Sequence, residues 1–509
     1  MAEAAAPRGA ARIADIPRYW AQHAPEAPAL FEDDRPVSFA VLVRRMEAAA
    51  HALRDAGVGA GDRVMIVGEN CAALIEALFG VSALGAWPVV VNARLTPREV
   101  DAVRAHCAPR VVLFTTRASP EAGVHAGRWN ATDPGTPGLE GLRVAPGSED
   151  AARESGADDV AALLYTSGTT GAPKGVMISH RGLLHFARVS AESRRLGPAD
   201  RAYAVLPISH IFGLATMLLA TLYAGASLYL RTRFDPGDVL HALAEREITM
   251  LQGVPTMFAR ILAHVRETGA RVRAPRLRYV YTGGAPLDPQ LKRDVEHLFG
   301  QPLHHGYGLT EYAGSLFITR ADAPRADTSS GYRVDGAELR IVDAEGGELP
   351  RGQVGELWIR GPGLMLGYYR APELTAETIK PGGWYATGDL GRLEADGALF
   401  LAGRTKDLVI HSGFNVYPVE VEAVINGHPA VQLSAVVGRP TADGNEDVIA
   451  FVEPKHAAHL DVVALHEYLR ERLAPYKRPA EIRVIEAIPT TASGKLLKQP
   501  LRALLKTHE

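Results

Sequence analysis

Hydrophobic and polar residues follow helical and strand periods in turn along most of the chain. Residues 37–58 repeat apolar positions at helical spacing and stop at Gly57, and residues 62–68 follow as a short apolar strand. A second helical pattern covers residues 72–86, and a second strand pattern covers residues 87–92. Strands that alternate with helices in this way predict an α/β fold, with helices packed on the faces of a sheet.

The pattern changes twice further along the chain. From Gly331, short strands separated by turns predict an antiparallel sheet or small β-barrel, at residues 337–343, 355–361 and 397–403. After Arg404, helical patterns at residues 418–429 and 462–473 enclose strand patterns at 433–440 and 447–454. We therefore predict a large N-terminal domain of stacked α/β subdomains with a β-barrel-like part, residues 1–403. A small, mobile α+β C-terminal domain follows, residues 404–509.

Less regular patterns cover two stretches. Residues 115–158 are rich in Pro, Gly and Ser and predict an irregular surface connection. No Asp, Glu, Lys or Arg lies between Arg201 and Arg231, a gap long enough to span a bilayer. However, Pro207 and Gly213 interrupt its first half, and a turn at Gly225 precedes a separate strand pattern. We therefore predict a buried loop, a core helix and a core strand, and no integral membrane segment.

Composition narrows the class of protein. A chain of 509 residues is too long for one hydrophobic core, so two or more domains are expected. The net charge of −3 gives no general attraction to nucleic acid or to an anionic membrane. The only cysteines, Cys71 and Cys107, exclude a disulfide framework and a Cys-rich zinc site. Because the N-terminus also lacks the apolar core of a secretory signal, the chain is predicted to be cytoplasmic.

The strongest chemical signal is the stretch from Tyr165 to Val176, YTSGTTGAPKGV. Glycines allow backbone N–H groups to approach phosphate oxygens closely, while the hydroxyl side chains and Lys174 add donors and positive charge. We therefore predict a polyphosphate-binding loop. It is not a Walker A loop, because Gly175 follows the lysine where that motif has Ser or Thr. The alternative, a flexible surface turn, does not account for the further motifs of the chain.

More segments carry polar groups suited to nucleotide chemistry. Residues 305–314, HGYGLTEYAG, hold a tyrosine between two glycines and then a hydroxyl and a carboxylate, which could stack a base, bind a phosphate and hold a hard cation. In residues 385–397, YATGDLGRLEADG, Asp389 can accept from ribose hydroxyls. Residues 403–422, GRTKDLVIHSGFNVYPVEVE, and 489–502, PTTASGKLLKQPLR, complete the set. A single segment of this kind is weak evidence, since glycine turns and solvated carboxylates are common.

Together and in this order, the motifs resemble those of the adenylate-forming superfamily, and the resemblance covers nearly the whole chain. This superfamily contains acyl- and aryl-CoA synthetases, adenylation domains of nonribosomal synthetases and beetle-type luciferases. Among its members the chain is most similar to bacterial acyl- or aryl-CoA ligases, including the 4-chlorobenzoate, 4-coumarate and fatty acid types. The resemblance implies ATP, Mg²⁺ and CoA as ligands.

It also implies a role for individual residues. The β- and γ-phosphates would be held by Thr166, Ser167, Gly168, Thr169, Thr170, Gly171 and Lys174. Gly284, Ala285 and Pro286 would form the adenine wall, with Tyr307 covering the purine beside Gly308. Thr310 would contact the α-phosphate, Glu311 would hold Mg²⁺, Asp389 and Arg404 would bind the ribose, and Lys495 would bridge the substrate carboxylate and the α-phosphate. Lys495 could otherwise be a solvated lysine near the C-terminus.

The implied reaction has two steps. The carboxylate attacks the α-phosphorus of ATP to give an acyl-adenylate and pyrophosphate, and the CoA thiol then displaces AMP. In the superfamily, Lys495 and the turn at Gly413 serve different steps, in different orientations of the C-terminal domain, and Lys406 matches the hinge between them. Catalysis depends on alignment and on neutralising charge at phosphate oxygens, so no covalent enzyme intermediate is required.

The resemblance also places an acyl pocket. His210 matches a gate between the carboxylate site and the thiol tunnel, although a structural buried histidine is the alternative. The wall positions are Ala187, His210, Ile211, Phe212, Gln252, Gly283, Gly306 and Ala313. Small residues at these positions predict a deeper cavity than a compact benzoate needs. The absence of Arg and Lys argues against a dicarboxylate, and the lack of an acid in the following helix argues against an α-amino acid. An apolar monocarboxylate follows, either a fatty acid or an extended arylalkanoate.

Alternatives remain at this stage. The chain could load its acyl-adenylate onto a separate carrier protein instead of CoA. A non-catalytic binding protein fits poorly, because the residues matched to catalysis and nucleotide binding are present. The sequence leaves open the acid, the number of subunits, including a homodimer, and regulation by acetylation of Lys495.

Overall fold

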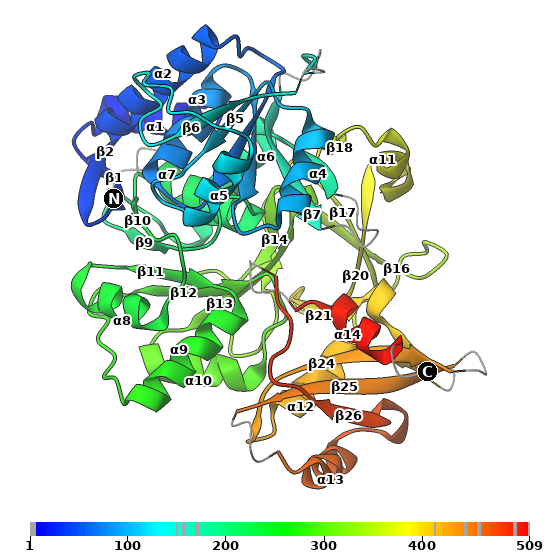
Figure 1. Cartoon of the computed structure of the whole chain (residues 1–509). Coiled ribbons are helices and arrows are strands. Elements are labelled where there is room, and N and C mark those ends of the chain that lie inside the picture. Colours follow the sequence, from blue (N-terminus) through cyan, green and yellow to red (C-terminus); the bar gives the residue numbers. More distant parts are fainter. Residues whose placement is uncertain are drawn as a thin grey trace.

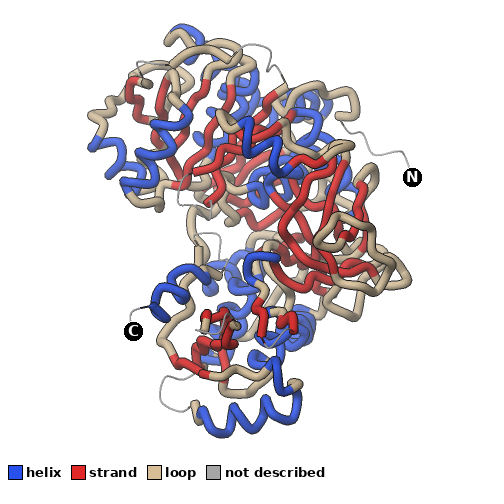
Figure 2. Tube along the Cα trace, turned by 90° about the vertical axis from the view of Figure 1, so that its right-hand side faces the viewer, coloured by secondary structure: helices blue, strands red, loops and turns tan. Residues whose placement is uncertain are grey.

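The computed structural model describes residues 7–148, 151–154, 159–167, 173–411, 414–441, 445–455, 460–491 and 496–506. Figures 1 and 2 show a large N-terminal part and a smaller C-terminal part. The N-terminal part contains two sheets built largely from parallel strands, with helices on both faces. The α/β fold predicted from the alternating patterns is therefore confirmed.

One sheet has the order β4-β3-β5-β6, with β3 (Arg63–Gly68) parallel to its neighbours β4 (Trp87–Asn92) and β5 (Val111–Phe114). These strands are entirely buried, as their apolar runs predict. Helices α2 (Phe39–Asp55) and α3 (Ala72–Ala83) pack on one side of the sheet. Helices α4 (Pro97–Cys107) and α5 (Pro120–Arg128) pack on the other side.

The region from residue 115 to 158 is less irregular than predicted. It contains α5 and the strand β6 (Arg143–Pro146), so that prediction was partly wrong. Ser119 accepts a hydrogen bond from the backbone of Ala122, and Pro120 occupies the first turn, which together begin the helix. Strand β6 exists because it pairs with β5, and a short segment gives little sign of such distant pairing.

The second sheet has the order β15-β14-β13-β12-β11-β9-β10-β1-β2. Its strands are β1 (Pro28–Glu32), β2 (Arg35–Ser38), β9 (Arg201–Ala204), β10 (Ser227–Leu230), β11 (Met250–Gly253), β12 (Tyr279–Gly283), β13 (Leu303–Leu309), β14 (Gly314–Ile318) and β15 (Tyr332–Arg333). Helices α8 (Pro236–Glu245), α9 (Pro255–Thr268) and α10 (Pro289–Phe299) cover one face. Helix α6 (His180–Ser193) and the π-helix η1 (Phe212–Leu219) lie against the other, while α1 (Asp15–His23) packs on α2.

The uncharged stretch between Arg201 and Arg231 folds as predicted. After β9 a buried loop leads into η1, α7 (Ala220–Tyr223) and the core strand β10, and Gly225 turns with a φ of 72°. Among the described residues, no helix is both long and apolar enough to cross a membrane.

A hairpin and an antiparallel sheet complete the N-terminal part. Strands β7 (Val160–Ser167) and β8 (Pro173–Ser179) pair antiparallel, and β18 (Gly367–Tyr368) joins β8. The antiparallel sheet contains β16 (Glu338–Val342), β17 (Gly355–Arg360), β19 (Ile379–Lys380), β20 (Trp384–Leu393) and β21 (Leu399–Arg404), with α11 (Pro372–Thr378) beside it. The antiparallel sheet predicted after Gly331 is thus confirmed.

The C-terminal part has its own apolar clusters, formed by residues between Val409 and Leu505. Its elements are β22 (Val409–His411), β23 (Phe414–Val416), α12 (Pro418–Asn426), β24 (Val431–Pro440), β25 (Glu446–Pro454), α13 (Val462–Arg472), β26 (Glu481–Val484) and α14 (Lys498–Lys506). Figure 1 shows this part at the lower right, next to β21. The division at residues 403 and 404 stays a prediction.

Candidate active site

Motif residues far apart in the chain meet where β13, β20 and β21 come together. The Tyr307 hydroxyl donates to Asp389 Oδ2 at 2.7 Å, and Arg404 Nε lies 2.9 Å from Asp389 Oδ1. Asp389 and Arg404 stand opposite each other in the register of β20 and β21. Burial, and then the Asp389 charge, raise the pKa of the Tyr307 phenol, so the phenol stays a neutral donor at pH 7. Each carboxylate oxygen of Asp389 therefore has a partner.

A second group of motif residues surrounds Tyr368. Its hydroxyl donates to Glu311 Oε1 at 3.0 Å and lies 3.0 Å from the Tyr385 hydroxyl. The Lys174 ammonium lies 5.9 Å from the centre of the Tyr368 ring, which brings the loop lysine to the same place as the Glu311 carboxylate. Lys174 stands opposite Thr166 in the hairpin register. The buried Thr310 precedes Glu311 in the short 3₁₀ turn η2 (Thr310–Tyr312).

Glycines at the ends of β12 and β13 allow the backbone to turn tightly and to lie close to the neighbouring strand. Gly284 has a φ of 81°, which favours glycine, and a Cβ on Gly308 would stand 2.3 Å from the Gly314 carbonyl oxygen. The His305 ring contacts the Ala285 carbonyl through Nε2 at 3.2 Å, and Pro286 follows in the chain. The segment matched to the adenine wall thus lies directly beside the segment that carries Tyr307.

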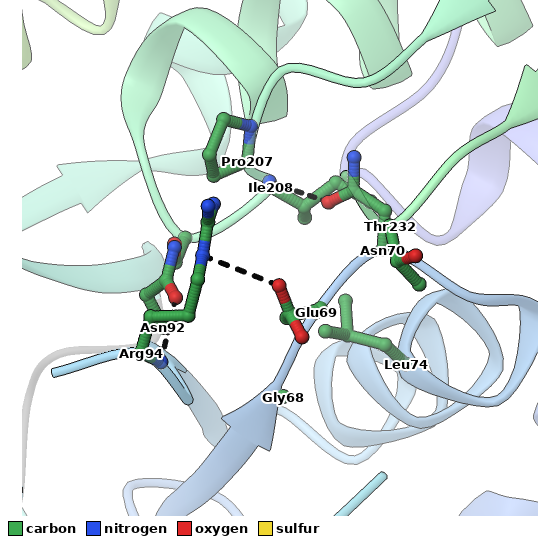
Figure 3. A pocket seen from close by; sticks show the side chains of 10 residues that line it. Gly68, Glu69, Asn70, Leu74, Asn92, Arg94, Pro207, Ile208 and Thr232 are labelled. Carbon is green, nitrogen blue, oxygen red and sulfur yellow. Dashed lines mark hydrogen bonds and ion pairs between the residues drawn. The ribbon is translucent and has the colours of Figure 1, made fainter. Parts of the chain in front are cut away.

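The segment from Pro207 to Phe212 lines two cavities. The first is lined by Gly68, Glu69, Asn70, Leu74, Asn92, Arg94, Pro207, Ile208, Ser209 and Thr232 (Figure 3). The second is lined by Leu206, Pro207, His210, Phe212, Gly213, Val254 and Gly284. Asn70 fixes the segment, because it donates to the Ala204 and Leu206 carbonyls and accepts from the Ile208 backbone. His210 Nδ1 accepts from the Phe212 backbone at 3.1 Å.

The predicted acyl-wall positions lie around the ends of β11, β12 and β13, with Ala187 on α6 and Ala313 after η2. The aromatic rings of Tyr281 and Phe212 fill the space beside Gly283 and Gly306. A Cβ on Gly306 would lie 2.2 Å from the Tyr281 hydroxyl, and a Cβ on Gly283 would touch Tyr281 and Phe212 at 3.4 and 3.6 Å. The sequence reasoning did not include Tyr281. Strand alternation in YTGG could have indicated it, because Tyr281 shares a face with Gly283.

A buried arginine behind this wall was also missed. Arg194, at the C-terminal end of α6, has no exposed surface, and its Nη1 donates to Gln252 Oε1 at 3.1 Å and to the Thr216 carbonyl at 2.9 Å. The predicted wall positions contain no cation, which speaks against a second acidic group on the substrate. Arg194 contacts one of those positions directly. Its sequence context, SRRLGPADR, reads as an ordinary charged turn and gives no sign of burial.

Other predicted residues lie outside the described residues or beside the site. Gly168, Thr169, Thr170, Gly171, Gly413 and Lys495 lie outside the described residues, as does the side chain of Ser167. Lys406 lies in η3 (Thr405–Asp407), and burial, then the Arg404 charge, lower its pKa. The neighbouring Asp407 is paired with Arg502 of α14 at 2.7 Å, so the predicted hinge is tied to the end of the C-terminal part.

Comparisons with known proteins agree with this geometry. The family model "AMP-binding enzyme" matches residues 17–369, and "AMP-binding enzyme C-terminal domain" matches residues 420–495. Feruloyl-CoA synthase of an Amycolatopsis species is 36% identical over 95% of this chain and 96% of its own length. 4-Coumarate–CoA ligase 2 of Oryza sativa subsp. japonica is 35% identical over 94% of this chain and 90% of its own.

Solved structures are similar over the whole chain. ATP-bound MatB from Rhodopseudomonas palustris superposes with a TM-score of 0.85 at 31% identity, covering 97% of this chain and 99% of that one. The anthranilate CoA ligase AuaEII with anthranoyl-AMP gives a TM-score of 0.86 at 28% identity, with 97% of each chain covered. The predicted superfamily and fold are therefore confirmed. The chain belongs to the AMP-binding enzyme family, as an ATP-dependent, AMP-forming acyl-CoA synthetase.

Proposed function

We propose that this synthetase activates an aromatic acid, of the arylpropenoic or arylalkanoic type, in preference to a fatty acid. The observation that carries the site assignment is the convergence of the phosphate hairpin, Glu311 and the Tyr307–Asp389–Arg404 group at one place. The first reaction forms the acyl-adenylate and pyrophosphate, and the second transfers the acyl group to CoA with release of AMP.

Asp389 and Arg404 are proposed to bind the ribose. Asp389 is mostly buried and held from two directions, so its carboxylate is oriented before ATP arrives. A carboxylate fixed in this way can accept from ribose hydroxyls without first losing rotamer freedom. The Tyr307 ring, on the strand beside the Gly284 segment, is proposed to cover the purine.

Glu311 is proposed to hold Mg²⁺ together with phosphate oxygens of ATP. The donor set fits this ion, because Mg²⁺ is usually held by one or two carboxylates plus substrate phosphates. The fit is also supported by position, since Glu311 and the loop lysine Lys174 both lie against Tyr368. When bound, the ion would neutralise phosphate charge. Tyr368 orients the Glu311 carboxylate, and Lys174 and Thr166 supply donors from the hairpin.

The segment that carries His210 is proposed to separate the acid from the thiol. It is supported by the two cavities that the segment lines, one of which includes His210 and Gly284. Gly213 allows this arrangement, because a Cβ there would stand 2.0 Å from the Pro207 carbonyl oxygen. Lys495 for adenylation, Gly413 for thioester formation and Lys406 as the hinge remain proposals that rest on the family resemblance.

The preference for an aromatic acid is supported by the relatives and by the rings at the pocket floor. Feruloyl-CoA synthase and 4-coumarate–CoA ligases are among the similar proteins, as is an indoleacetate–CoA ligase from Aromatoleum aromaticum at 32% identity. Phe212 and Tyr281 meet edge to face, with ring centres 5.8 Å apart. An aromatic ring of the substrate can pack favourably against such a pair.

Pyrophosphate exchange and AMP release test the proposal. Purified protein with ATP, Mg²⁺ and CoA is given cinnamate, 3-phenylpropionate, octanoate, malonate and phenylalanine, and labelled pyrophosphate exchange is measured with and without CoA. We expect exchange with the aromatic acids and release of AMP only when CoA is present. Highest activity with octanoate would reject the aromatic preference. Exchange that never leads to an acyl-CoA would favour a carrier protein as the acceptor.

A further inference from the structure

Arg194 is a buried cation, and the Tyr279 hydroxyl, a neutral group, lies toward its guanidinium. The Nε and Nη2 atoms of its guanidinium are fully buried and have no hydrogen-bond partner among the described residues. The ion pairs found in the described part of the chain do not include Arg194. Because a buried charge without a counter-charge is costly, an arginine in this state needs an explanation.

The groups around Arg194 add donors or neutral rings, and no carboxylate. Because arginine can only donate, the Gln252 amide must turn its oxygen toward Arg194, which leaves Gln252 Nε2 as a further buried donor without a partner among the described residues. The guanidinium carbon lies 4.6 Å from the Tyr281 ring centre and 5.9 Å from that of Tyr279. Burial lowers the pKa of His304, which stacks on Tyr279, to about 4, so His304 is neutral at pH 7.

Asp200, the carboxylate in the loop that follows Arg194, already has other partners. Asp200 lies within ion-pair distance of Arg278, at 2.5 Å, and accepts from the Thr249 hydroxyl at 2.8 Å. Arg278 in turn donates to the backbone carbonyl of Arg194, not to its side chain. The buried donors of Arg194 and Gln252 therefore match a ligand oxygen that can accept hydrogen bonds.

The position of Arg194 relative to the nucleotide motifs shows where such a group would belong. Strands β11, β12 and β13 run parallel, and their glycine-rich ends, with Gly283 and Gly306, lead to the Thr310 end of the site. Tyr281 and Gln252, which contact Arg194, pair with each other two residues before Gly283, or about 7 Å deeper. An acid whose carboxylate lies near Thr310 and whose body follows the glycines would point its far end at Arg194.

We propose that Arg194 and Gln252 bind an oxygen acceptor at the far end of the acid, such as a phenol oxygen or a second carboxylate. The assignment rests on the proposed function, which places the acid along these strands. Phe212 lies between the cavity beside His210 and Tyr281, and Tyr281 lies over the guanidinium, so both rings must turn for the acid to reach Arg194. Such a turn gives up the edge-to-face contact between the two rings.

The proposal is tested with acids that differ only in the presence of an oxygen-bearing group at the far end. Wild-type enzyme, Arg194→Met and Gln252→Leu are compared on cinnamate, 4-hydroxycinnamate and 4-carboxycinnamate, as kcat/KM for pyrophosphate exchange. We expect the wild type to prefer the acids with the distal oxygen by roughly 100-fold or more, because a site built to bond a polar group strongly rejects the analogue that lacks it. Arg194→Met should reduce this ratio to within about tenfold of unity, mainly through loss on the oxygen-bearing acids.

Arg188→Met is the matched control. Arg188 lies on the same helix, partly exposed and paired with Glu192 and Asp335 at the surface, so the ratio between acids should not change. Equal loss on all acids in Arg194→Met would indicate a purely structural arginine and reject the proposal, as would an unchanged ratio.

Binding provides a test independent of turnover. Calorimetric titration of the same acids into the AMP-saturated protein should show the same preference in the wild type and its loss in Arg194→Met. A wild type that binds cinnamate as tightly as 4-hydroxycinnamate and 4-carboxycinnamate rejects the role of Arg194, whatever the enzyme activates. Failure of every acid to support pyrophosphate exchange, with this binding preference intact, would instead reject the proposed function.

Discussion

Removal of the Tyr307 hydroxyl should weaken ATP binding without removing the stacking surface. In Tyr307→Phe, Asp389 loses the 2.7 Å hydrogen bond and keeps only Arg404, while the aromatic ring stays in place. A hydrogen bond to a charged group contributes about 1.5–3 kcal/mol to stability. If all of this free energy held Asp389 in position for the ribose, the Kd for ATP would rise by about 10- to 150-fold. Because Arg404 still restrains the carboxylate, we expect about tenfold.

The assay is pyrophosphate exchange with ATP varied at saturating acid, together with urea unfolding. Tyr307→Phe should raise the KM for ATP about tenfold with little change in kcat, since the hydroxyl contacts no reacting atom. Tyr229→Phe is the matched control, because Tyr229 donates to Asp34 at the same 2.7 Å, away from the site. It should lower the free energy of unfolding and leave the KM unchanged. An unchanged KM for ATP in Tyr307→Phe would refute the idea that this bond orients the ribose ligand.

Further predictions concern the two half-reactions and the response to pH. Lys495→Ala should reduce adenylation by ~10²–10³ and spare thioester formation from added acyl-adenylate, and equal loss in both assays would contradict its assigned role. Lys406→Pro should spare adenylation and strongly depress thioester formation, because proline fixes φ at the proposed hinge; rapid-quench measurement of both steps checks this. His304 has a pKa lowered to about 4, so its contribution to stability is complete above pH 6.5 and is lost as the pH falls toward 4. Unfolding free energy should therefore fall between pH 7 and pH 5, and His304→Phe should reduce that fall by ~1–2 kcal/mol.

The sequence predicts those residues whose position can be filled by only one or a few residue types. Gly284 and Gly308 stand where the chain turns with positive φ or passes within contact of another strand, so only glycine fits. Asp389 and Glu311 could be predicted because their segments occur in the order of the superfamily's motifs, although each segment alone is weak evidence. Helices α2 and α3 and strands β3 and β4 could also be predicted from their apolar patterns, whereas α1, β1 and β2 were not.

Residues whose role depends on a distant neighbour could not be predicted. Strand β6 is held by pairing with β5, and Tyr368 reaches Glu311 across 57 positions of the chain. Neither dependence leaves a local pattern, since a tyrosine in a short strand looks alike whether it faces solvent or a carboxylate. The same holds for Arg194, which ends a helix in a segment of ordinary polarity and becomes buried only because η1 and β11 close over it.

The wall positions alone describe the acyl pocket incompletely. Small residues at Gly283 and Gly306 suggested depth, yet a glycine determines only how close its neighbour can approach. Here that neighbour is Tyr281, whose hydroxyl occupies the space that a Gly306 side chain would need. The glycines therefore admit a protein ring, and the ring in turn covers the cation behind it. On the role proposed for Arg194, substrate length and polarity depend on the layer behind the wall, Tyr281, Gln252 and Arg194. An enzyme with the same wall residues and an apolar residue in place of Arg194 should then prefer acids without a polar far end.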